Sequence, residues 1–552
     1  MNRALLPFVL KLQSRVLEKM KSQQGALLLA LAQACLIRGS HAVPVPGKGL
    51  DANEPFPGFV SFSIEFSSFP DYAGNNSNPN KYSDNLLDNL GNLMGTKPYI
   101  RVGGNTQDIA LYNASLPYGI EGTYTNPTAD YPNIISIGPS YFESYNTFTA
   151  TKFSHGFHFV RAATDARGWQ TLRDTVPLAC KALAGGKLNV WEYGNELDLV
   201  RNMPKWNEAA YVADWQEGSR IIRDLVQRNC SELGSTTFMA PSNAGVGNAL
   251  RAPAMWQAGL ASDENITLFS THNYISGANA LGVTLQGTLM NHNNTVNSVN
   301  AHVVEYNKIT AQDASAPPLT FGECNSLYNQ GKPGLSNTFG AALWGVDFSL
   351  YSASVGFKRS HMHQGTNYRY ASWQPIHTAK TTIGTKAPYY GNIAVAAFLG
   401  NQTATPPRIA NIPLNDTREA AYAAYVNSGK TLARILVVNL NAYNSTVDGI
   451  GEVALPPAEL EPRPSKNFTF TVPDGNLRPG SAVGLRRLLA NGSDAISGIT
   501  FDGWSYNYEL AHGRPVRLAN VTVGETVTVD AQGAVTVAVQ DSSAVILDFD
   551  LR

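Results

Sequence analysis

Two glutamates in this sequence each follow a short apolar stretch of the chain. Glu196 closes "NVWEYGNE", where it stands beside Asn195, and Glu323 closes "PLTFGE". Taken singly, each is more often a cap or a salt-bridge partner, because carboxyl and amide groups at a strand end need hydrogen-bond partners or solvent. If both strands belong to one sheet, however, two carboxylates about 5–5.5 Å apart could serve as the acid/base and the nucleophile of glycoside cleavage with retention. Asn195 could then donate to a sugar 2-hydroxyl, and this combination favours the catalytic interpretation.

The chain before and between these glutamates alternates short β-rich runs with helical patterns, from about residue 57 to about 388. Amphipathic stretches such as Asn207–Arg228 and Asn337–Ser354 repeat apolar residues every three or four positions, as helices that pack on a sheet do. Eight strands with intervening helices predict a (β/α)8 TIM barrel, in which strands four and seven lie nearly opposite each other and reacting groups gather at the C-terminal ends. The strand candidates are FVSFSIEF, PYIRVGG, FSHGFHFV, KLNVWEYGNE, TTFMAPS, ITLFSTHNY, PLTFGE and VGFKRSHMH. The segment 106–151, rich in Tyr, Asn, Pro and Gly, is predicted to be an elaborated loop with small hairpins.

After about Gly391 the pattern changes to short strands with period-2 alternation and Gly, Asp and Asn turns, such as LARILVVNLN, NFTFTVP and AVTVAVQ. This pattern predicts an antiparallel β-sandwich, with the Pro-rich Leu455–Pro464 as a loop inside it. The fold class is therefore α/β plus all-β. We expect a signal peptide at 1–42, a catalytic barrel at 43–390 and a mainly structural β-sandwich domain at 391–552.

The N-terminus and the glycosylation sequons indicate export. The apolar run Gly25–Ile37 follows Lys19 and Lys21 and precedes "SHA", which resembles a signal-peptide cleavage site. A start at Met20 would give a signal of ordinary length, and the alternative is a signal anchor that stays attached. N-x-Ser/Thr sequons stand at Asn75, Asn113, Asn229, Asn265, Asn293, Asn401, Asn415, Asn444, Asn467, Asn491 and Asn520. We expect a secreted, N-glycosylated protein that has no membrane attachment after signal cleavage.

Charge and cysteine content exclude several classes of function. The formal net charge is −1 with a sequence pI of about 6.8, which argues against nucleic acid or an anionic membrane as the main partner. Beyond the signal run, Cys180, Cys230 and Cys324 allow at most one disulfide and leave a free thiol. No Cys/His spacing resembles a metal site. Two carboxylates suffice for the chemistry, so we expect no metal and no cofactor.

Five stretches carry a family resemblance. "GNE" on strand four with a glutamate on strand seven is the pattern of the clan A retaining glycoside hydrolases. Together with SIEF, RVGGNTQD, WEYGNE, GECNSLYNQG and HQGTNYRYASWQP, the chain resembles glycoside hydrolase family 79, which contains β-glucuronidases and heparanases. The likeness covers essentially the whole chain after the signal. One departure is Leu197, where the family usually has proline; the loss of that rigid residue would loosen the loop without removing a reacting group.

The resemblance implies roles for individual residues. It makes Glu196 the acid/base and Glu323 the nucleophile, and it assigns Tyr274 to orienting the nucleophile. It further implies a set of sugar-binding groups: Glu65 and Asn105 on hydroxyls, Asn195 on the 2-hydroxyl, and Tyr328, Tyr368 and the backbone amides around Gly365, Thr366 and Asn367 on the uronic carboxylate.

Burial and strand parity predict the roles of the neighbours of these residues. Glu196 must stay protonated near the working pH, so it should lie in apolar surroundings or close to the charge of Glu323. Glu192 shares strand parity with Glu196 and is predicted to be a buried structural carboxylate paired with a group such as Arg101. Cys324 is predicted to be a buried thiol on the opposite face of its strand. For His272, His361 and His363 we expect a structural or subsite role rather than proton transfer.

Three functions remain open from the sequence. The favoured one is an exo-acting retaining β-glucuronidase that releases glucuronic acid, or its 4-O-methyl form, from glycan ends. A heparanase-like endo-β-glucuronidase would need clusters of Lys and Arg for a densely anionic chain, and the only tight one is Arg486–Arg487. A catalytically inert carbohydrate-binding protein would not need both glutamates.

Overall fold

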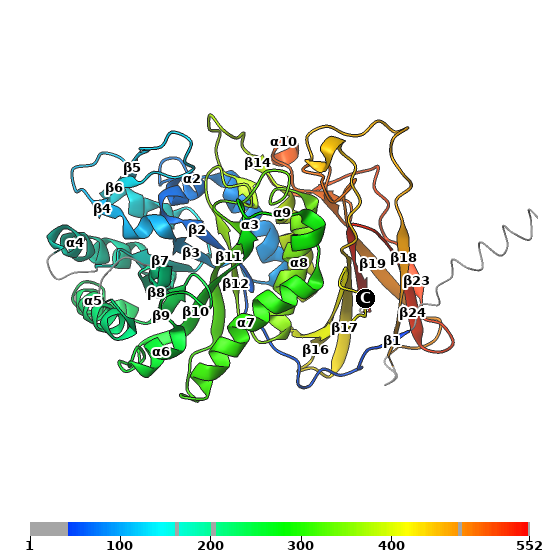
Figure 1. The fold of residues 1–552 in the computed structure, drawn as a ribbon, viewed down its shortest axis with the longest axis horizontal. Helices are drawn as coiled ribbons and strands as arrows, with labels where there is room; N and C mark the ends of the chain where they lie inside the picture. The colour runs from blue at the N-terminus through cyan, green and yellow to red at the C-terminus, as the bar shows by residue number, and fades with distance from the viewer. Residues whose placement is uncertain (1–41, 161–164, 200–205, 473–476, 550–552) are drawn as a thin grey trace, which may run out of the picture.

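The computed structural model describes residues 42–160, 165–199, 206–472 and 477–549. Figure 1 shows a barrel of strands and helices on one side and a β-rich domain on the other, with α8 (Phe339–Ser354) and α9 (Ala387–Leu399) between them. Both helices are buried nearly all round, as their continuous apolar sequences require when a helix is covered on two sides.

Eight parallel strands close into a barrel in the order in which they occur along the chain. This confirms the predicted (β/α)8 architecture and all eight strand candidates. The strands are β2 (Val60–Glu65), β3 (Ile100–Gly103), β7 (Phe153–Phe157), β8 (Leu188–Tyr193), β9 (Phe238–Asn243), β10 (Ile266–Gly277), β11 (Leu319–Tyr328) and β12 (Ser360–Gln364).

An α-helix covers the outside of the barrel after every strand except β3. These helices are α3 (Lys81–Met94), α4 (Ala166–Ala182), α5 (Glu208–Asn229), α6 (Ala252–Gln257), α7 (His292–Thr310), α8 and α9, with the short α2 (Phe69–Ala73) ahead of α3. After β3 the chain instead forms a small sheet, β4 (Ala110–Tyr112), β5 (Ile120–Thr123) and β6 (Ile134–Ile137), in which β5 and β6 pair antiparallel. The elaborated loop predicted for this region is confirmed.

The C-terminal domain consists of two sheets. The larger contains β15 (Arg408–Ile412), β16 (Glu419–Val426), β17 (Thr431–Asn439), β25 (Ser543–Asp548), β19 (Ala482–Leu489), β20 (Thr500–Phe501), β21 (Trp504–Ser505), β22 (Val516–Arg517) and β23 (Thr526–Thr528); the smaller contains β1 (Val43–Pro44), β18 (Ser465–Thr471) and β24 (Ala534–Gln540). The short β13 (Trp373–Gln374), β14 (Gly384–Thr385) and α10 (Tyr508–Ala511) lie outside these two sheets.

Strand β16 shows why the two domains hold together. Ala420, Tyr422 and Ala424 belong to the core shared with the barrel, whereas Ala421 and Ala423 belong to the core between the two sheets. Because successive strand residues point to opposite faces, one sheet buries both of its faces in this way. The β-sandwich is therefore anchored on the barrel and not attached by a linker.

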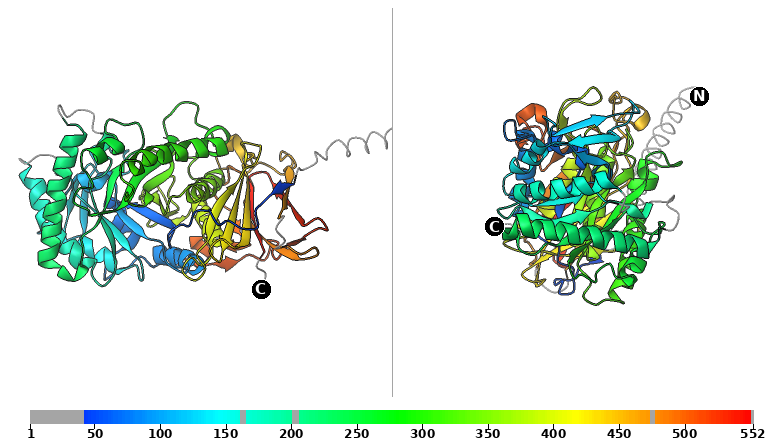
Figure 2. Two further views of the ribbon diagram at one scale, coloured as in Figure 1. Left: turned by 90° about the horizontal axis from the view of Figure 1, so that it is seen from below. Right: turned by 90° about the vertical axis from the view of Figure 1, so that its left-hand side faces the viewer.

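The predicted domain limits need two corrections. β1 pairs with β18, so the first described strand belongs to the β-sandwich domain although it precedes the barrel; Figure 2 shows this dark blue segment beside the orange and red strands. The predicted boundary between residues 390 and 391 falls inside α9, the helix that follows the eighth barrel strand. The predicted signal segment lies outside the described residues apart from Ala42.

Cys180 at the end of α4 forms a disulfide with Cys230, which follows α5, and Cys324 remains a free, buried thiol. Both the single bridge and the buried thiol agree with the sequence expectation. Across the described ranges, no helix combines the length and the apolar character needed to cross a membrane.

Candidate active site

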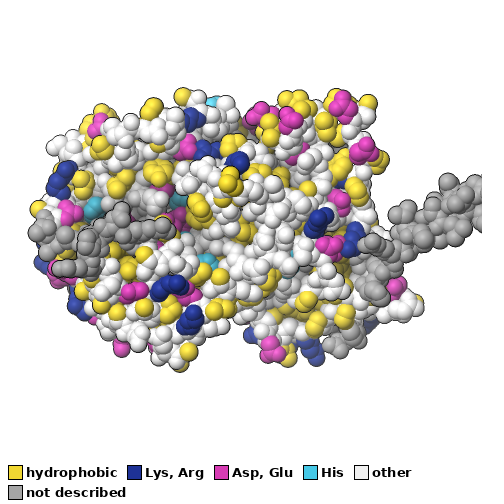
Figure 3. All heavy atoms as spheres, viewed as in Figure 1, with side chains coloured by type: hydrophobic (Ala, Val, Ile, Leu, Met, Phe, Trp, Pro, Cys, Tyr) yellow, Lys and Arg dark blue, Asp and Glu magenta, His cyan; other side chains and the backbone are white. Residues whose placement is uncertain are grey.

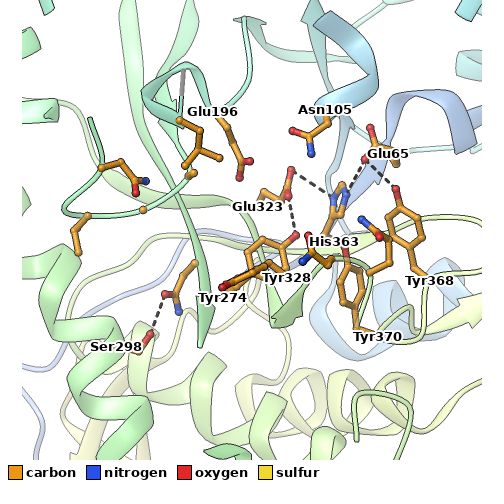
Figure 4. A pocket seen from close by; sticks show the side chains of 18 of the residues that line it. Glu65, Asn105, Glu196, Tyr274, Ser298, Glu323, Tyr328, His363, Tyr368 and Tyr370 are labelled. Atoms are coloured by element: carbon orange, nitrogen blue, oxygen red, sulfur yellow. Dashed lines mark hydrogen bonds and ion pairs between the residues drawn. The ribbon is translucent and has the colours of Figure 1, made fainter. Parts of the chain in front are cut away.

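A cavity of about 650 Å³ opens at the C-terminal ends of the barrel strands, and both predicted glutamates lie on its wall. One carboxylate oxygen of Glu196, one of Glu323 and a ring nitrogen of His272 all lie within 4.8 Å of one another. Figure 4 shows the two carboxyl groups turned toward each other across the cavity. The separation suits direct attack on a sugar and is shorter than the roughly 6.5–9.5 Å that inversion through an interposed water requires.

The backbone places Glu196 by a sharp turn after β8. Gly194 has φ 87° and Glu196 itself has φ 52°, a left-handed conformation that is costly for a residue with a Cβ. The turn is held by hydrogen bonds from the Glu196 amide to the Ser242 carbonyl at 3.0 Å and from the Asn195 amide to Asp108 Oδ2 at 2.9 Å. Leu197 is 2% exposed and packs into the core, so the missing proline is replaced by a buried anchor at this position.

The sequence predicted Glu323 at the end of its strand, but the residue lies within β11, because β11 continues to Tyr328 beside the long strand β10. Its two oxygens are held separately. Tyr274 donates to Oε1 at 2.7 Å, and Arg101 donates through Nη1 to Oε2 at 2.6 Å. These donors occupy the carboxylate from both sides and favour an oriented nucleophile over a metal ligand.

The two glutamates have opposite shifts in pKa. Burial, together with the neighbouring charge of Glu323, raises the pKa of Glu196 well above its ordinary value. Burial alone would also raise the pKa of Glu323, but His363, Arg101 and the hydrogen bond from Tyr274 outweigh it and hold that pKa well below the ordinary value. At mildly acidic pH one residue therefore carries a proton and the other a negative charge, which is the division that acid catalysis with a nucleophile requires.

Arg101 is the buried centre of this arrangement. Beside its bond to Glu323, it donates through Nε to Glu192 Oε2 at 2.7 Å and through Nη2 to Asn195 Oδ1 at 2.6 Å. The predicted pairing of Glu192 with Arg101 is confirmed, and Glu192 is fully buried inside the barrel. With its oxygen held by Arg101, Asn195 directs Nδ2 toward Asn105 Oδ1 at 3.0 Å.

Glu65, Asn105 and Tyr368 line the same cavity as the two glutamates, together with His363. Figure 4 shows all four on one side of Glu323. Tyr368 donates to Glu65 Oε2 at 3.2 Å, and His363 Nδ1 lies 3.6 Å from Glu323 Oε2. The sugar-binding residues that the resemblance implied are thus largely brought together.

The predicted backbone amides are not on the cavity wall. Gly365, Thr366 and Asn367 do not line it; the Thr366 amide donates to Ser68 Oγ at 3.1 Å and the Asn367 amide to Gln374 Oε1 at 3.0 Å. Because these amides already have partners, they are not free to hold a uronic carboxylate in this structure. Of the predicted carboxylate-binding groups, Tyr368 and the half-exposed Tyr328 at the rim line the cavity.

Several residues in or beside the cavity were not predicted as site residues. His272 Nδ1 lies 2.9 Å from Glu196 Oε1, and burial lowers the pKa of His272 to about 4, so its ring is neutral near neutral pH. Tyr370 stands inside the quoted HQGTNYRYASWQP stretch and could have been found there. Tyr131 comes from the loop between β5 and β6, and Asn273 and Ser298 come from β10 and α7; no sequence signal marked these three.

A closed (β/α)8 barrel with a protonated and an ionised carboxyl group facing each other at its mouth is the arrangement of a retaining glycoside hydrolase. The family model for the glycosyl hydrolase family 79 C-terminal beta domain matches residues 421–546. A β-glucuronidase of Neurospora crassa is 58% identical over 531 residues, which cover 90% of this chain and 95% of that protein. A β-glucuronidase of Aspergillus niger is 52% identical over 501 residues, which cover 89% of this chain and 90% of that protein. The chain belongs to glycoside hydrolase family 79.

Solved structures agree with this fold. A 4-O-α-L-rhamnosyl-β-D-glucuronidase from Fusarium oxysporum superposes with a TM-score of 0.73 at 24% identity, covering 92% of this chain and all of that one. A family 51 α-L-arabinofuranosidase from Bifidobacterium longum superposes with a TM-score of 0.58 at 13% identity, covering 92% and 99% of the two chains. At these identities the likeness concerns the fold.

Proposed function

We propose that this protein is a secreted, exo-acting, retaining β-glucuronidase that removes terminal β-linked glucuronic acid from glycans. The observation that carries the proposal is the pair Glu196 and Glu323, with oxygens within 4.8 Å and pKa values shifted in opposite directions. The names of the two similar fungal proteins, both β-glucuronidases, supply the substrate class.

In this mechanism Glu323 attacks the anomeric carbon while Glu196 gives its proton to the departing glycosidic oxygen. The bond to the leaving group breaks as a covalent glycosyl–enzyme bond forms. Glu196, now ionised, takes a proton from water, which attacks the anomeric carbon and releases Glu323 and the sugar. Asn195, whose oxygen is fixed by Arg101, presents its amide nitrogen for the 2-hydroxyl.

Phenols supply the recognition of the uronic carboxylate in this proposal. Tyr131, Tyr328 and Tyr370 line the cavity together with Tyr368, whose hydroxyl donates to Glu65 Oε2 at 3.2 Å. A phenol donates a hydrogen bond without adding a fixed charge. None of the described residues on the cavity wall is Lys or Arg. Such a wall suits one carboxylate held by neutral donors better than a densely sulfated chain, which requires clustered cations. On the face in Figure 3, Lys and Arg side chains are scattered among acidic ones.

The loop between β5 and β6 supports exo action because it contributes a side chain to the cavity wall. Tyr131 on this loop lines the cavity, and its neighbour Asp130 pairs with Arg369 Nη1 at 2.6 Å and Lys380 Nζ at 3.2 Å. A loop pinned in this way leaves room for a terminal sugar and blocks a chain that continues past it.

Exposure of the glycosylation sequons supports the proposed secretion. Of the eleven asparagines, only Asn265 is buried, at 4% exposure, and its side-chain nitrogen and oxygen have no hydrogen-bond partner within the described part of the chain. The other ten are exposed and accessible to a glycan.

The test compares hydrolysis of an aryl β-glucuronide with that of the matching aryl β-glucoside. We expect glucuronide turnover with a β-configured first product by NMR, lost in Glu323→Gln and kept in Glu232→Gln, a change on the exposed surface. A first product of α configuration would refute retention. Binding of glucuronate without turnover of any aryl glycoside would indicate an inert binder, and mid-chain cutting of heparan sulfate without aryl glucuronide turnover would indicate the heparanase-like alternative.

A further inference from the structure

The cavity continues past the two glutamates into a second arm that no role assigned above accounts for. Its wall is formed by the loop after β9 and by β10 and α7, with Val246, Asn248, Asn273, Ser298 and His302. Figure 4 shows Ser298 on the opposite side of Glu323 from Glu65 and Tyr368. The cavity therefore offers two compartments, one on each side of the reacting carboxylates.

The position of Glu196 identifies which compartment receives the leaving group. Glu65 and Tyr368 lie on the same side of the cavity as His363, whose Nδ1 is 3.6 Å from Glu323 Oε2. The backbone amide of Glu196, in contrast, donates to the carbonyl of Ser242, which directly precedes the loop that forms the second arm. In a retaining glycosidase the acid stands beside the departing oxygen. The second arm is consequently where the leaving sugar would lie.

The loop that forms this arm is held rigidly by Asp198, two residues after the acid. Asp198 accepts from the Ala244 amide at 2.8 Å and from Asn248 Nδ2 at 2.7 Å, and its own carbonyl accepts from the Ala249 amide at 3.2 Å. Acid and loop are thereby fixed to each other, as a subsite on the leaving-group side requires.

The side-chain amide of Asn273 in this arm is only half satisfied. Its Oδ1 accepts from Ser298 Oγ at 2.9 Å and from His302 Nε2 at 3.3 Å, while Nδ1 of His302 pairs with Thr271 Oγ1 at 3.0 Å. Asn273 is 5% exposed, and its Nδ2 has no hydrogen-bond partner among the residues that the structure describes. A buried donor left unsatisfied is costly unless a ligand pairs with it.

The chemistry of the arm defines the ligand. Burial lowers the pKa of His302 to about 3, so this ring is neutral, and the described side chains of the arm carry no charge. Ala244, Val246 and Ala301 supply small apolar surface for the C–H face of a sugar ring, and Asn273 supplies a donor for a hydroxyl oxygen.

We propose that Asn273, held by Ser298 and His302, forms a leaving-group subsite that selects glucuronides whose next residue is an uncharged sugar. This rests on the proposed glucuronidase function, since a leaving-group side exists only if Glu196 is the acid. Contacts with this second sugar stabilise the transition state in which the glycosidic bond breaks. Loss of these contacts therefore lowers kcat/KM for disaccharide substrates, whereas kcat/KM for an aryl glucuronide, which has no second sugar, is unchanged.

The experiment measures kcat/KM for an aryl β-glucuronide, a glucuronyl-β-linked neutral disaccharide and a glucuronyl-β-linked disaccharide with a sulfated second sugar. We expect the unmodified enzyme to prefer the neutral disaccharide to the sulfated one. We expect Asn273→Ala and Ser298→Ala to lose about tenfold on the neutral disaccharide, the worth of one hydrogen bond, and to keep aryl glucuronide turnover within about twofold. Asn297→Ala, an exposed change on the same helix, serves as the control.

Equal losses on the aryl and disaccharide substrates would overturn the subsite, as would full retention of disaccharide activity or a preference for the sulfated sugar. If Asn273→Ala does not fold, Ser298→Ala on the more accessible helix surface decides the same question. Turnover of the aryl glucuronide by the unmodified enzyme tests the proposed function separately. Its absence would refute that function. Its presence, with disaccharide kinetics unchanged in Asn273→Ala and Ser298→Ala, would refute only the subsite.

Discussion

The hydrogen bond from Tyr274 to Glu323 can be removed with little disturbance of packing. Tyr274→Phe deletes the hydroxyl that donates to Oε1 at 2.7 Å and keeps the ring that packs against Tyr370 at 6.0 Å between centroids. Since a hydrogen bond to the charged form of an acid lowers its pKa, the substitution raises the pKa of Glu323. The nucleophile must be ionised to attack, so the acidic limb of the pH profile moves to higher pH.

The size of this shift follows from the strength of the bond. A hydrogen bond to a charged group contributes about 1.5–3 kcal/mol, and one pKa unit corresponds to about 1.4 kcal/mol, so the acidic limb should move up by about one to two units. Because His363 and Arg101 still favour the charged carboxylate, the enzyme should remain active at the pH optimum, with kcat/KM reduced about tenfold.

The assay is the pH dependence of kcat/KM on an aryl β-glucuronide, which reports the pKa values of the free enzyme. Tyr328→Phe is the control, because Tyr328 is half-exposed at the rim of the cavity and its loss should raise KM without moving the acidic limb. An unchanged acidic limb in Tyr274→Phe, with an unchanged melting temperature, would refute the assignment of Tyr274 as the group that orients the nucleophile.

Three further outcomes are expected. In secreted protein, peptide mapping by mass spectrometry should find no glycan on Asn265, because the folded chain buries it; an occupied Asn265 in active enzyme would contradict this. Burial alone would lower the pKa of His292, but Asp347, whose Oδ1 lies 2.8 Å from Nδ1, raises it. The charged form of His292 therefore stabilises the fold, and His292→Gln should lower the melting temperature most below about pH 6.5 and least once the pH exceeds the raised pKa. A decrease that does not depend on pH would argue against the ion pair. Replacing Cys180 and Cys230 by Ala opens a bridge between residues 50 apart and should cost about 2–4 kcal/mol of stability, visible as a lower melting temperature with kcat/KM unchanged.

The approach of Glu196 to Glu323 could be predicted from the sequence because the closure of a barrel brings the ends of its strands together. Glu192 lies on β8, so its burial inside the barrel follows from the alternation of side chains. Glu196 lies in the left-handed turn after β8, so its position at the mouth follows from the end of the strand and not from parity. The pairing of Glu192 with Arg101 needed only the further rule that a buried charge is paired. These inferences use local patterns and the geometry of the fold class, and the structure agrees with them.

Features that depend on distant contacts were not predictable in the same way. β11 continues past Glu323 because the neighbouring strand β10 continues beside it, as far as the pair Gly277 and Tyr328. No pattern within the sequence of β11 shows that β10 extends so far. Tyr131 reaches the cavity because Asp130 is held by Arg369 and Lys380, far along the chain. Loop conformation is set by such tertiary contacts, so the sequence predicted an elaborated loop but not which of its side chains would enter the site.

Arg101 shows how one buried residue determines several properties of the site at once. Its guanidinium holds Glu323 on one nitrogen, Asn195 on another and Glu192 on the third. Because the fork of an arginine is planar and rigid, these three bonds also fix the carboxylate of Glu323 and the amide of Asn195 relative to each other. Arg101 lowers the pKa of Glu323. It also acts to lower the pKa of Glu196, but burial and the neighbouring charge of Glu323 outweigh it and keep that pKa raised. The opposite pKa shifts of Glu196 and Glu323, on which the proposed mechanism depends, thus arise from a buried charge network and not from either carboxylate alone.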